Sequence, residues 1–296
     1  MAAKLIHGYE VVIGFETHTQ LTTSSKIFSR ASTAFGAQPN TQACAVDLAL
    51  PGTLPVMNKG AVERAIRFGL AIGAHVAPRS IFARKNYFYP DASKNYQLTQ
   101  YDKPSTANGH VDFEFDGAGS KDGFARVRIT RAHLEEDVAK NFHFERHSGV
   151  DFNRAGVPLL EIVSEPDITS ADMAYEYLNA LKDILVYGGI SDCDMEKGMV
   201  RCDVNISVRP KGTTKLGTKI EIKNMNSFSG VRKALEYEIP RQVAVQRSRR
   251  QSSRELRRGR ALDRPDKDAD RGERSRATRR RTIRSSVCST AVASSV

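Results

Sequence analysis

Several segments of the chain alternate between apolar and polar residues, as β-strands do when one face lies in the core. The alternation is strict over residues 199–209, where apolar residues at even positions oppose Arg201, Asp203 and Asn205. The same pattern recurs over residues 9–21, 125–131 and 219–223. These segments predict a sheet with an apolar face toward the core and a second face that carries charged side chains.

Three other segments have apolar residues at helical spacing and predict helices over residues 58–73, 167–188 and 227–239. The second is the clearest, because Thr169 or Ser170 can cap its start and Gly188 can end it. The third is expected to end before Pro240, since proline breaks a helix interior. Strands and helices in irregular order predict an α+β domain with a largely antiparallel sheet, not a doubly wound parallel one.

The composition of the chain changes abruptly near residue 246. Residues 246–296 hold 15 Arg, one Lys and six acidic residues, and so carry +10 of the formal net charge of +11. They contain none of the 22 aromatic residues. Such a segment buries too little apolar surface to offset the entropy cost of ordering. We therefore predict a globular body over residues 1–245 and a disordered basic tail over residues 246–296.

Several classes of protein are disfavoured by the sequence. No stretch approaches the roughly 20 apolar residues that span a bilayer, so no membrane association is expected. The four cysteines form no CxxC pair and no disulfide framework, which favours a cytoplasmic protein. The chain has no GxGxxG, GxSxG or HExxH motif. The nearest approach to a P-loop, residues 212–219, has Thr218 where the lysine belongs and precedes a predicted strand.

Glu161 is the most informative single residue, because it interrupts the apolar run of residues 157–163. A carboxylate in such a strand must be paired, protonated or bound to a metal. A structural ion pair with one of the many arginines, or a strand whose polar face is simply solvated, would also explain it. Further acidic residues lie in or just after strand-like segments: Glu16, Glu135, Glu136, Asp137, Asp203 and Glu221.

Acids on a sheet, together with His18, suit a divalent cation such as Mg²⁺. Basic residues on the same faces would hold phosphate oxygens: Arg126, Arg128, Arg201, Lys219 and Lys223. The combination is the outline of a phosphoryl-transfer site. Spacing alone does not establish that these faces converge.

Seven segments in order along the chain closely resemble the B subunit of the aspartyl/glutamyl-tRNA amidotransferases. They are residues 11–21, 50–66, 84–102, 133–140, 151–168, 198–212 and 219–228. The resemblance implies a cradle domain similar in fold to glutamine synthetase, with metal-binding acids on an antiparallel sheet. It also implies an ATP- and Mg²⁺-dependent ligase that forms a carbon–nitrogen bond with glutamine as amide donor. In this family the B subunit phosphorylates the side-chain carboxylate on Glu-tRNA(Gln) or Asp-tRNA(Asn), an A subunit supplies ammonia, and a C subunit completes a heterotrimer.

The resemblance also assigns roles to individual residues. The metal ligands carried over from the family are His18, Glu136 and Glu161, and the catalytic acids are Glu16, Glu136 and Glu161. Residues near the nucleotide are expected to be Arg128, Arg201, Asp203, Glu221 and Lys223. Lys85 and Lys94 match lysines of the family's ammonia passage, with Glu136 at its outlet.

Two departures from the family pattern stand out. Many members have Cys-Pro-Val-Cys where this chain has Cys44-Ala45-Val46-Asp47, so a metal site built on that cysteine pair is not expected here. After about residue 245 the family pattern stops. We interpret residues 246–296 as an out-of-frame translation, and the alternative is an RNA-binding extension. Two further hypotheses stay open for the whole chain: a stand-alone metal-dependent enzyme that activates carboxylates, and a non-catalytic RNA-binding or assembly protein.

Overall fold

The computed structural model describes residues 6–225 and 227–262 of the chain. The chain divides into two structural units, Met1–Arg249 and Arg250–Val296. The sheet, the helices that cover it and the candidate site all belong to the first unit. Of the second unit, residues 250–262 are described, and they are helical.

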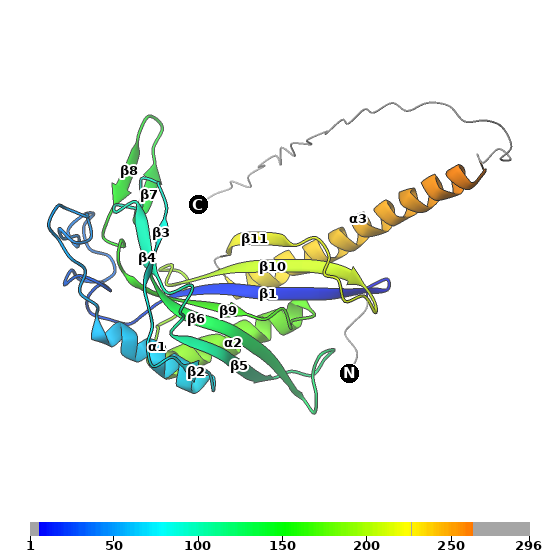
Figure 1. Ribbon diagram of the computed structural model, residues 1–296, viewed down its shortest axis with the longest axis horizontal. Coiled ribbons are helices and arrows are strands. Elements are labelled where there is room, and N and C mark those ends of the chain that lie inside the picture. Colours follow the sequence, from blue (N-terminus) through cyan, green and yellow to red (C-terminus); the bar gives the residue numbers. More distant parts are fainter. Residues whose placement is uncertain (1–5, 226, 263–296) are drawn as a thin grey trace, which may run out of the picture. The chain divides into compact units, whose positions relative to one another are not determined.

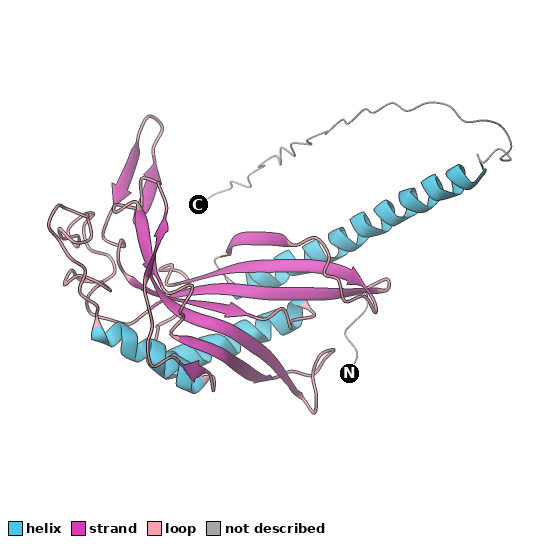
Figure 2. Ribbon diagram, viewed as in Figure 1, coloured by secondary structure: helices cyan, strands magenta, loops and turns pink. Residues whose placement is uncertain are grey.

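One nine-stranded sheet organises the first unit, and each of its strand pairs is antiparallel (Figures 1 and 2). Its main path runs in the order β11 (Ile220–Met225), β10 (Val200–Pro210), β1 (Tyr9–Gln20), β9 (Pro158–Ser164), β6 (Phe124–Glu136), β4 (Tyr96–Thr99) and β3 (Ala83–Asn86). β5 (Thr106–Glu114) pairs with β6, and β2 (His75–Val76) pairs with β5. A separate hairpin joins β7 (Lys140–His143) to β8 (Ser148–Asp151). The predicted α+β class with a largely antiparallel sheet is confirmed.

Within the described residues, three helices accompany the sheet: α1 (Lys59–Ala71), α2 (Ala171–Tyr187) and α3 (Phe228–Leu262). Asn58 caps α1 by accepting a hydrogen bond from the Gly60 amide, and Ser170 caps α2 by accepting one from the Met173 amide. The helices predicted over residues 58–73 and 167–188 are therefore confirmed. Within the described part of the chain, no helix combines the length and the apolar character that a membrane span needs.

The predicted end of the third helix before Pro240 is wrong, because α3 continues through this proline to Leu262. Proline in a helix interior costs about 3 kcal/mol. Here the buried stripe of Leu235, Ile239 and Val243 carries on past it, and packing of that stripe outweighs the penalty. α3 thus crosses the boundary predicted at residue 246. Residues 263–296 lie outside the described residues, and the division at residue 245 stays a prediction.

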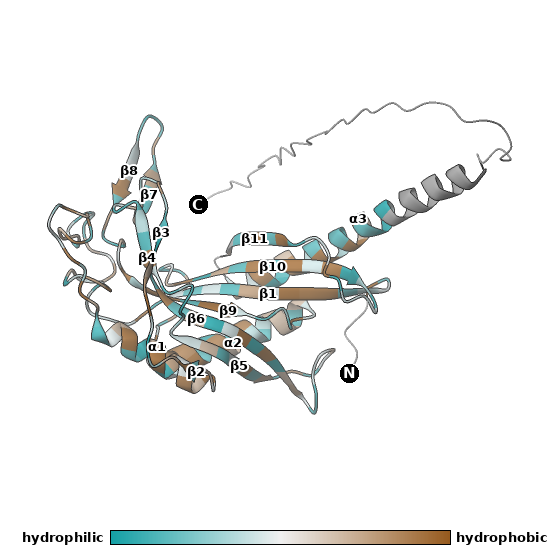
Figure 3. Cartoon of the chain, viewed as in Figure 1, coloured by the Kyte–Doolittle hydropathy of each residue, from teal (hydrophilic) through white to brown (hydrophobic). Residues whose placement is uncertain are grey.

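The apolar residues of the strands and the helices form one core on one face of the sheet. Val11, Ile13 and Phe15 of β1 are almost fully buried, and Figure 3 shows the apolar character of this strand. The Phe15 ring lies 5.7 Å, centroid to centroid, from the ring of Tyr177 on α2. Because one face of the sheet packs against this core, every second residue of β1, β9, β6 and β10 points to the other face.

A buried ion pair fixes the long loop between β1 and α1. Lys26 is fully buried, and its Nζ lies 3.3 Å from Oδ2 of Asp47. Asp47 also accepts hydrogen bonds from the Ser29 hydroxyl and the Cys44 amide. Burial lowers the pKa of Lys26, and the charge of Asp47 opposes that change. Asp47, which stands where the family pattern has its second cysteine, therefore holds several parts of this loop together.

Replacing Asp47 with alanine should lower the free energy of unfolding by about 3 kcal/mol, because it leaves the Lys26 ammonium buried without its partner. Urea unfolding followed by circular dichroism measures the change. The matched control is Glu63→Ala, which removes an exposed pair with Lys59 at 3.5 Å and should cost under about 0.5 kcal/mol. Equal costs for the two variants would contradict a structural role for the buried pair.

Candidate metal centre

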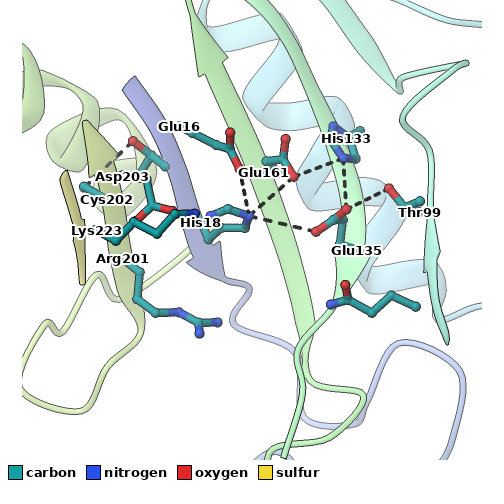
Figure 4. A network of polar contacts seen from close by, with 12 residues as sticks. Glu16, His18, Thr99, His133, Glu135, Glu161, Arg201, Cys202, Asp203 and Lys223 are labelled. Atoms are coloured by element: carbon teal, nitrogen blue, oxygen red, sulfur yellow. Dashed lines mark hydrogen bonds and ion pairs between the residues drawn. The ribbon is translucent and has the colours of Figure 1, made fainter. Parts of the chain in front are cut away.

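Four neighbouring strands place one polar side chain each in a single row across the sheet. In the strand register, His18 of β1 lies opposite Arg201 of β10 on one side and opposite Glu161 of β9 on the other. Glu161 in turn lies opposite His133 of β6. Directly paired residues on one face of an antiparallel sheet have Cβ atoms about 5 Å apart. The row therefore brings together residues that are far apart in the sequence (Figure 4).

Glu161 is at the centre of this row and is only 4% exposed. Its Oε2 lies 3.4 Å from Nε2 of His18 and 3.4 Å from Nε2 of His133. Its Oε1 lies 3.6 Å from Nη2 of Arg131. Glu161 thus contacts an arginine, as one sequence interpretation expects, and it also lies among side chains of the kinds that ligate metals.

Two groups of side chains in the described part of the chain have the spacing of metal ligands, and they share Glu161. Glu16, His18 and Glu161 form one, and His133, Glu135 and Glu161 form the other. Within each group the ligand atoms lie within 4.8 Å of one another. Ligands held about 2.1 Å from a metal stand roughly 3.0–3.4 Å apart, so small side-chain movements would close either group around an ion. Carboxylate oxygens with an imidazole nitrogen suit a divalent cation.

The charges of the cluster change the protonation of its members. Burial, together with the charge of Glu161, raises the pKa of Glu16. Burial alone would lower the pKa of His18, but the hydrogen bond to Glu161 and the surrounding carboxylates outweigh it, and the pKa is raised. Burial alone would raise the pKa of Glu135, but the hydrogen bonds of its carboxylate with His133 and Thr99 and the charge of Lys85 hold this pKa well below its usual range. The cluster is therefore an acidic environment that stabilises positive charge.

Of the predicted metal ligands, the structure brings His18 and Glu161 together and places Glu136 elsewhere. Glu135 takes the position that Glu136 was expected to occupy. The cause is a β-bulge in β6, where the register with β9 steps two residues from Ile129 to Arg131 against one residue on the partner strand. Strict alternation from Arg126 would put even-numbered residues on the polar face. The bulge shifts that phase by one, so His133 and Glu135 face the cluster.

Glu136 instead contacts Lys94 through its Oε1 and accepts a hydrogen bond of 2.8 Å from the Leu98 amide through Oε2. Burial raises its pKa, and the charge of Lys94 opposes this. Glu136 and Lys94 line a small hollow together with Asp47 and Asp137. The other predicted passage residue, Lys85, lies 3.8 Å from Oε1 of Glu135 and so reaches the metal-binding cluster.

Four of the residues predicted near a nucleotide flank the cluster on β10 and β11, and the fifth does not. Arg201 donates a hydrogen bond of 2.7 Å to Oδ1 of Asp137. Nζ of Lys223 lies 3.4 Å from Asp203 and 3.3 Å from Glu221, and Asp203 lies opposite Glu16 in the register. Arg128 is bound through two nitrogens to Asp167, at 2.6 Å and 2.9 Å. Its guanidinium is occupied there, outside the cluster.

The sequence interpretation did not name Thr99, Arg131 or His133 as members of the cluster, and it named Glu135 among the acids of the sheet without assigning it as a ligand. The Thr99 hydroxyl donates a hydrogen bond of 2.8 Å to Glu135, and the Arg131 guanidinium lies 4.5 Å from the ring centroid of Tyr101. His133 and Glu135 were within a motif that carries the family resemblance. The spacing of His133 and Glu135, two residues apart in one strand, was a usable signal for a shared face.

An α+β domain that carries carboxylates and imidazoles on the open face of an antiparallel sheet has the side chains that metal-assisted catalysis uses. Comparison with known families identifies a catalytic domain. The chain belongs to the family described as the GatB/GatE catalytic domain, whose model matches residues 11–286. The resemblance carried by the seven motifs is confirmed.

Individual relatives share more than half of the aligned residues. The B subunit of the aspartyl/glutamyl-tRNA(Asn/Gln) amidotransferase of Variovorax paradoxus (strain S110) is 61% identical over 240 residues, which are 80% of this chain and 49% of the relative. The corresponding proteins of Coxiella burnetii (strain Dugway 5J108-111) and Albidiferax ferrireducens are each 59% identical, over 239 and 238 residues, again 80% of this chain and 49% of the relative. The chain thus spans about half the length of these relatives.

The variant Glu161→Gln should lose at least tenfold in affinity for Mn²⁺, because Glu161 belongs to both ligand groups. Electron paramagnetic resonance of free Mn²⁺ measures the affinity on the full chain. Glu10→Gln is the matched control, since Glu10 lies on β1 like Glu16 but is paired with Arg209 outside the cluster. An unchanged affinity in Glu161→Gln would show that the cluster is not the metal centre.

Metal affinity should rise with pH until His18 has lost its proton. A metal binds neutral imidazole, and the raised pKa of His18 means that a bound proton must leave before this side chain can act as a ligand. The slope should be at most about tenfold per pH unit and should level off above the pKa of His18. Isothermal titration calorimetry in buffers of different ionisation enthalpy would detect the released proton. A pH-independent affinity, or one that falls as pH rises, would contradict the assignment of His18 as a ligand.

Proposed function

We propose that this chain provides the carboxylate-activating site of a tRNA-dependent amidotransferase, as part of a B subunit. The relatives named in the comparison act on aspartyl/glutamyl-tRNA(Asn/Gln), and the chain belongs to their family. The observation that carries the proposal is the group formed by Glu16, His18 and Glu161 on adjacent strands. It is a site for a divalent cation beside basic side chains, which is what ATP-dependent phosphoryl transfer requires.

Mg²⁺ is the cation proposed for this centre. Glu16, His18 and Glu161 would hold it, with His133 and Glu135 as the second ligand group around the shared Glu161. When bound, the ion would neutralise phosphate charge on ATP. The acidic character of the cluster supports this fit, since burial and the charge of Glu161 raise the pKa of Glu16, and the neighbouring carboxylates raise the pKa of His18 against the effect of burial.

The basic residues of β10 and β11 would act on the phosphates. Arg201 is held by Asp137, which is itself almost fully buried, so the guanidinium is oriented before a ligand arrives. Lys223 lies between two carboxylates and is more than half exposed, so its ammonium can turn to an incoming phosphate. Together they would stabilise the charge that develops on the transferred group.

The proposed reaction has two steps. A side-chain carboxylate oxygen on the misacylated tRNA attacks the γ-phosphorus of ATP, ADP leaves, and an acyl phosphate forms. Ammonia then attacks the acyl carbon, inorganic phosphate leaves, and the nitrogen loses a proton as the amide forms. Activation turns a poor leaving group, oxide, into phosphate. The cluster would serve the first step.

The hollow beside Glu136 would serve the second step. Lys94 and Glu136 form a shielded ion pair there, and Lys85 reaches from the edge of the sheet to Glu135. Ammonia is a nucleophile only when unprotonated, so a polar passage closed to bulk water has a chemical purpose. We propose that an A subunit delivers ammonia to this side, and that a C subunit completes a cytoplasmic heterotrimer that acts in translation.

The test is amidation of Glu-tRNA(Gln) by the chain combined with the A and C subunits of the Variovorax relative. Glu161→Gln should lower the rate roughly a hundredfold with either glutamine or ammonium chloride as nitrogen source. Lys94→Met should slow the reaction with glutamine and leave the reaction with ammonium chloride nearly unchanged. The split between nitrogen sources separates a passage residue from a catalytic one.

Three outcomes would contradict the proposal. Turnover of ATP with free glutamate and without tRNA would favour a stand-alone carboxylate-activating enzyme. RNA binding that is lost with residues 246–296, in a chain that turns over no ATP, would favour an RNA-binding protein. Amidation in Glu161→Gln at the rate of the control Glu10→Gln would remove the cluster from the reaction.

A further inference from the structure

Arg131 is a charged side chain at the metal-binding cluster to which the proposed function gives no role. It lies on β6, two residues before His133, and 22% of its side chain is exposed. The bulge after Ile129 puts Arg131 on the same face of the strand as His133 and Glu135. Arg131 therefore stands at the edge of the cluster, with its side chain mostly but not wholly buried.

The guanidinium of Arg131 has donor capacity that its neighbours leave unused. Its Nε is buried and has no hydrogen-bond partner in the described part of the chain. Its Nη2 lies 3.6 Å from Oε1 of Glu161, which is longer than a hydrogen bond. Arg126 and Arg128 on the same strand differ, because each is bound through two nitrogens to an aspartate. A largely buried arginine with unused donors can take a further acceptor.

An aromatic ring holds this guanidinium in place. Cζ of Arg131 lies 4.5 Å from the ring centroid of Tyr101, which follows β4. The Tyr101 ring also meets the His133 ring edge-on, at 6.4 Å between centroids. A guanidinium stacked on a ring keeps the N–H groups at its edge free to donate, and their fork matches the two oxygens of a carboxylate. Arg131 is thus oriented before a ligand arrives.

Arg131 and the residues proposed to act on the phosphates lie on opposite sides of the cluster. Arg201 and Lys223 belong to β10 and β11 on one side of His18, whereas β6 lies beyond Glu161 on the other side (Figure 4). In phosphoryl transfer the attacking and the leaving oxygens lie on opposite sides of the transferred phosphorus. With the phosphates held from β10 and β11, the attacking oxygen belongs on the side of β6.

An attacking carboxylate needs a cation on that side. The cluster already holds the carboxylates of Glu16, Glu135 and Glu161, and like charges repel an incoming anion. Lys85 reaches this side too, but it is more than half exposed, and its charge is paired with Glu135, whose pKa it helps to lower. Arg131 is better placed, because its donors are unused and the Tyr101 ring fixes their direction.

We propose that Arg131 binds the side-chain carboxylate of the aminoacyl group that the cluster activates. Its guanidinium would donate to one carboxylate oxygen and leave the other free to attack the γ-phosphorus. The amide product carries no charge, so Arg131 would hold it more weakly than the substrate, which favours its release. The inference rests on the proposed function, because it takes this carboxylate to be phosphorylated at the cluster.

The experiment measures the binding of two substrate mimics to the full chain by isothermal titration calorimetry in the presence of Mg²⁺. Both are adenosine with an aminoacyl group in stable amide linkage at the ribose 3′ position. One carries a glutamyl group and the other a glutaminyl group, so they differ only in carboxylate against amide. The chain should bind the glutamyl mimic at least about tenfold more tightly. Arg131→Gln should abolish this preference, and Arg131→Lys, which keeps the charge but loses the fork, should retain part of it.

Two further variants complete the design. Arg126→Gln makes the same chemical change on β6, in an exposed pair with Asp112 outside the cluster, and should alter neither affinity. Tyr101→Leu changes a side chain that is 60% exposed, so the chain should still fold. Loss of the ring should lower the preference for the glutamyl mimic several-fold, and this variant serves if Arg131→Gln is unstable.

The outcomes separate this inference from its rivals and from the proposed function. A preference that persists in Arg131→Gln, or absence of binding by both mimics, would overturn it. A changed Mn²⁺ affinity in Arg131→Gln with an intact preference would also overturn it and leave Arg131 as a structural partner of Glu161. Loss of tripolyphosphate binding in this variant, again with an intact preference, would assign Arg131 to the phosphates instead. Selection of the glutamyl mimic by Arg131, with no effect of Glu161→Gln on Mn²⁺ affinity, would support the inference and count against the metal-binding cluster.

Discussion

The burial of the Glu161 carboxylate is the constraint on which the rest of the site depends. A charge in the middle of an apolar strand at the centre of a sheet is tolerated only where neighbouring strands compensate it. β1 and β6 do so with His18, His133 and Arg131, each within 3.6 Å of a carboxylate oxygen. The antiparallel strand pairing itself places these partners. His18 and His133 lie directly opposite Glu161, and Arg131 lies opposite Val163, two residues further along β9. The strand pairing that builds the sheet therefore also supplies the side chains that compensate the charge of Glu161.

Placing the ligands on strands also fixes how much they can move. The cluster is built on one face of a sheet whose opposite face is filled by the core with Phe15 and Tyr177, whereas the hollow beside Glu136 is lined mainly by loop residues. A sheet packed in this way holds side chains more firmly than loops do. Functional groups with different tasks can therefore keep constant separations along β1, β6 and β10.

Much of this arrangement was predictable from the sequence, and what was missed has identifiable physical causes. Glu161 stood out because it broke an apolar run, and the strict alternation in β10 placed Arg201 and Asp203 on one face correctly. The bulge after Ile129 could not be read, because it leaves no proline or glycine as a marker, and so Glu135 was not assigned as a ligand. Arg128 lies outside the cluster because it pairs with Asp167, 39 residues away, a contact that no local pattern reports. Pro240 misled for a related reason, since long-range packing of α3 outweighed its local preference.

The adjacent pair Glu135 and Glu136 shows how closely the strand separates two chemical environments. One carboxylate has its pKa held low and joins the metal-binding cluster, and the other has its pKa raised and contacts Lys94 in a different hollow. A substitution at either position changes one environment and spares the other. The insertion or deletion of a single residue between the bulge and Glu136 would reverse the faces of the sheet to which the two acids point, because side chains in a strand alternate strictly. The length of this short stretch of β6 is therefore under stronger constraint than the identity of most residues within it.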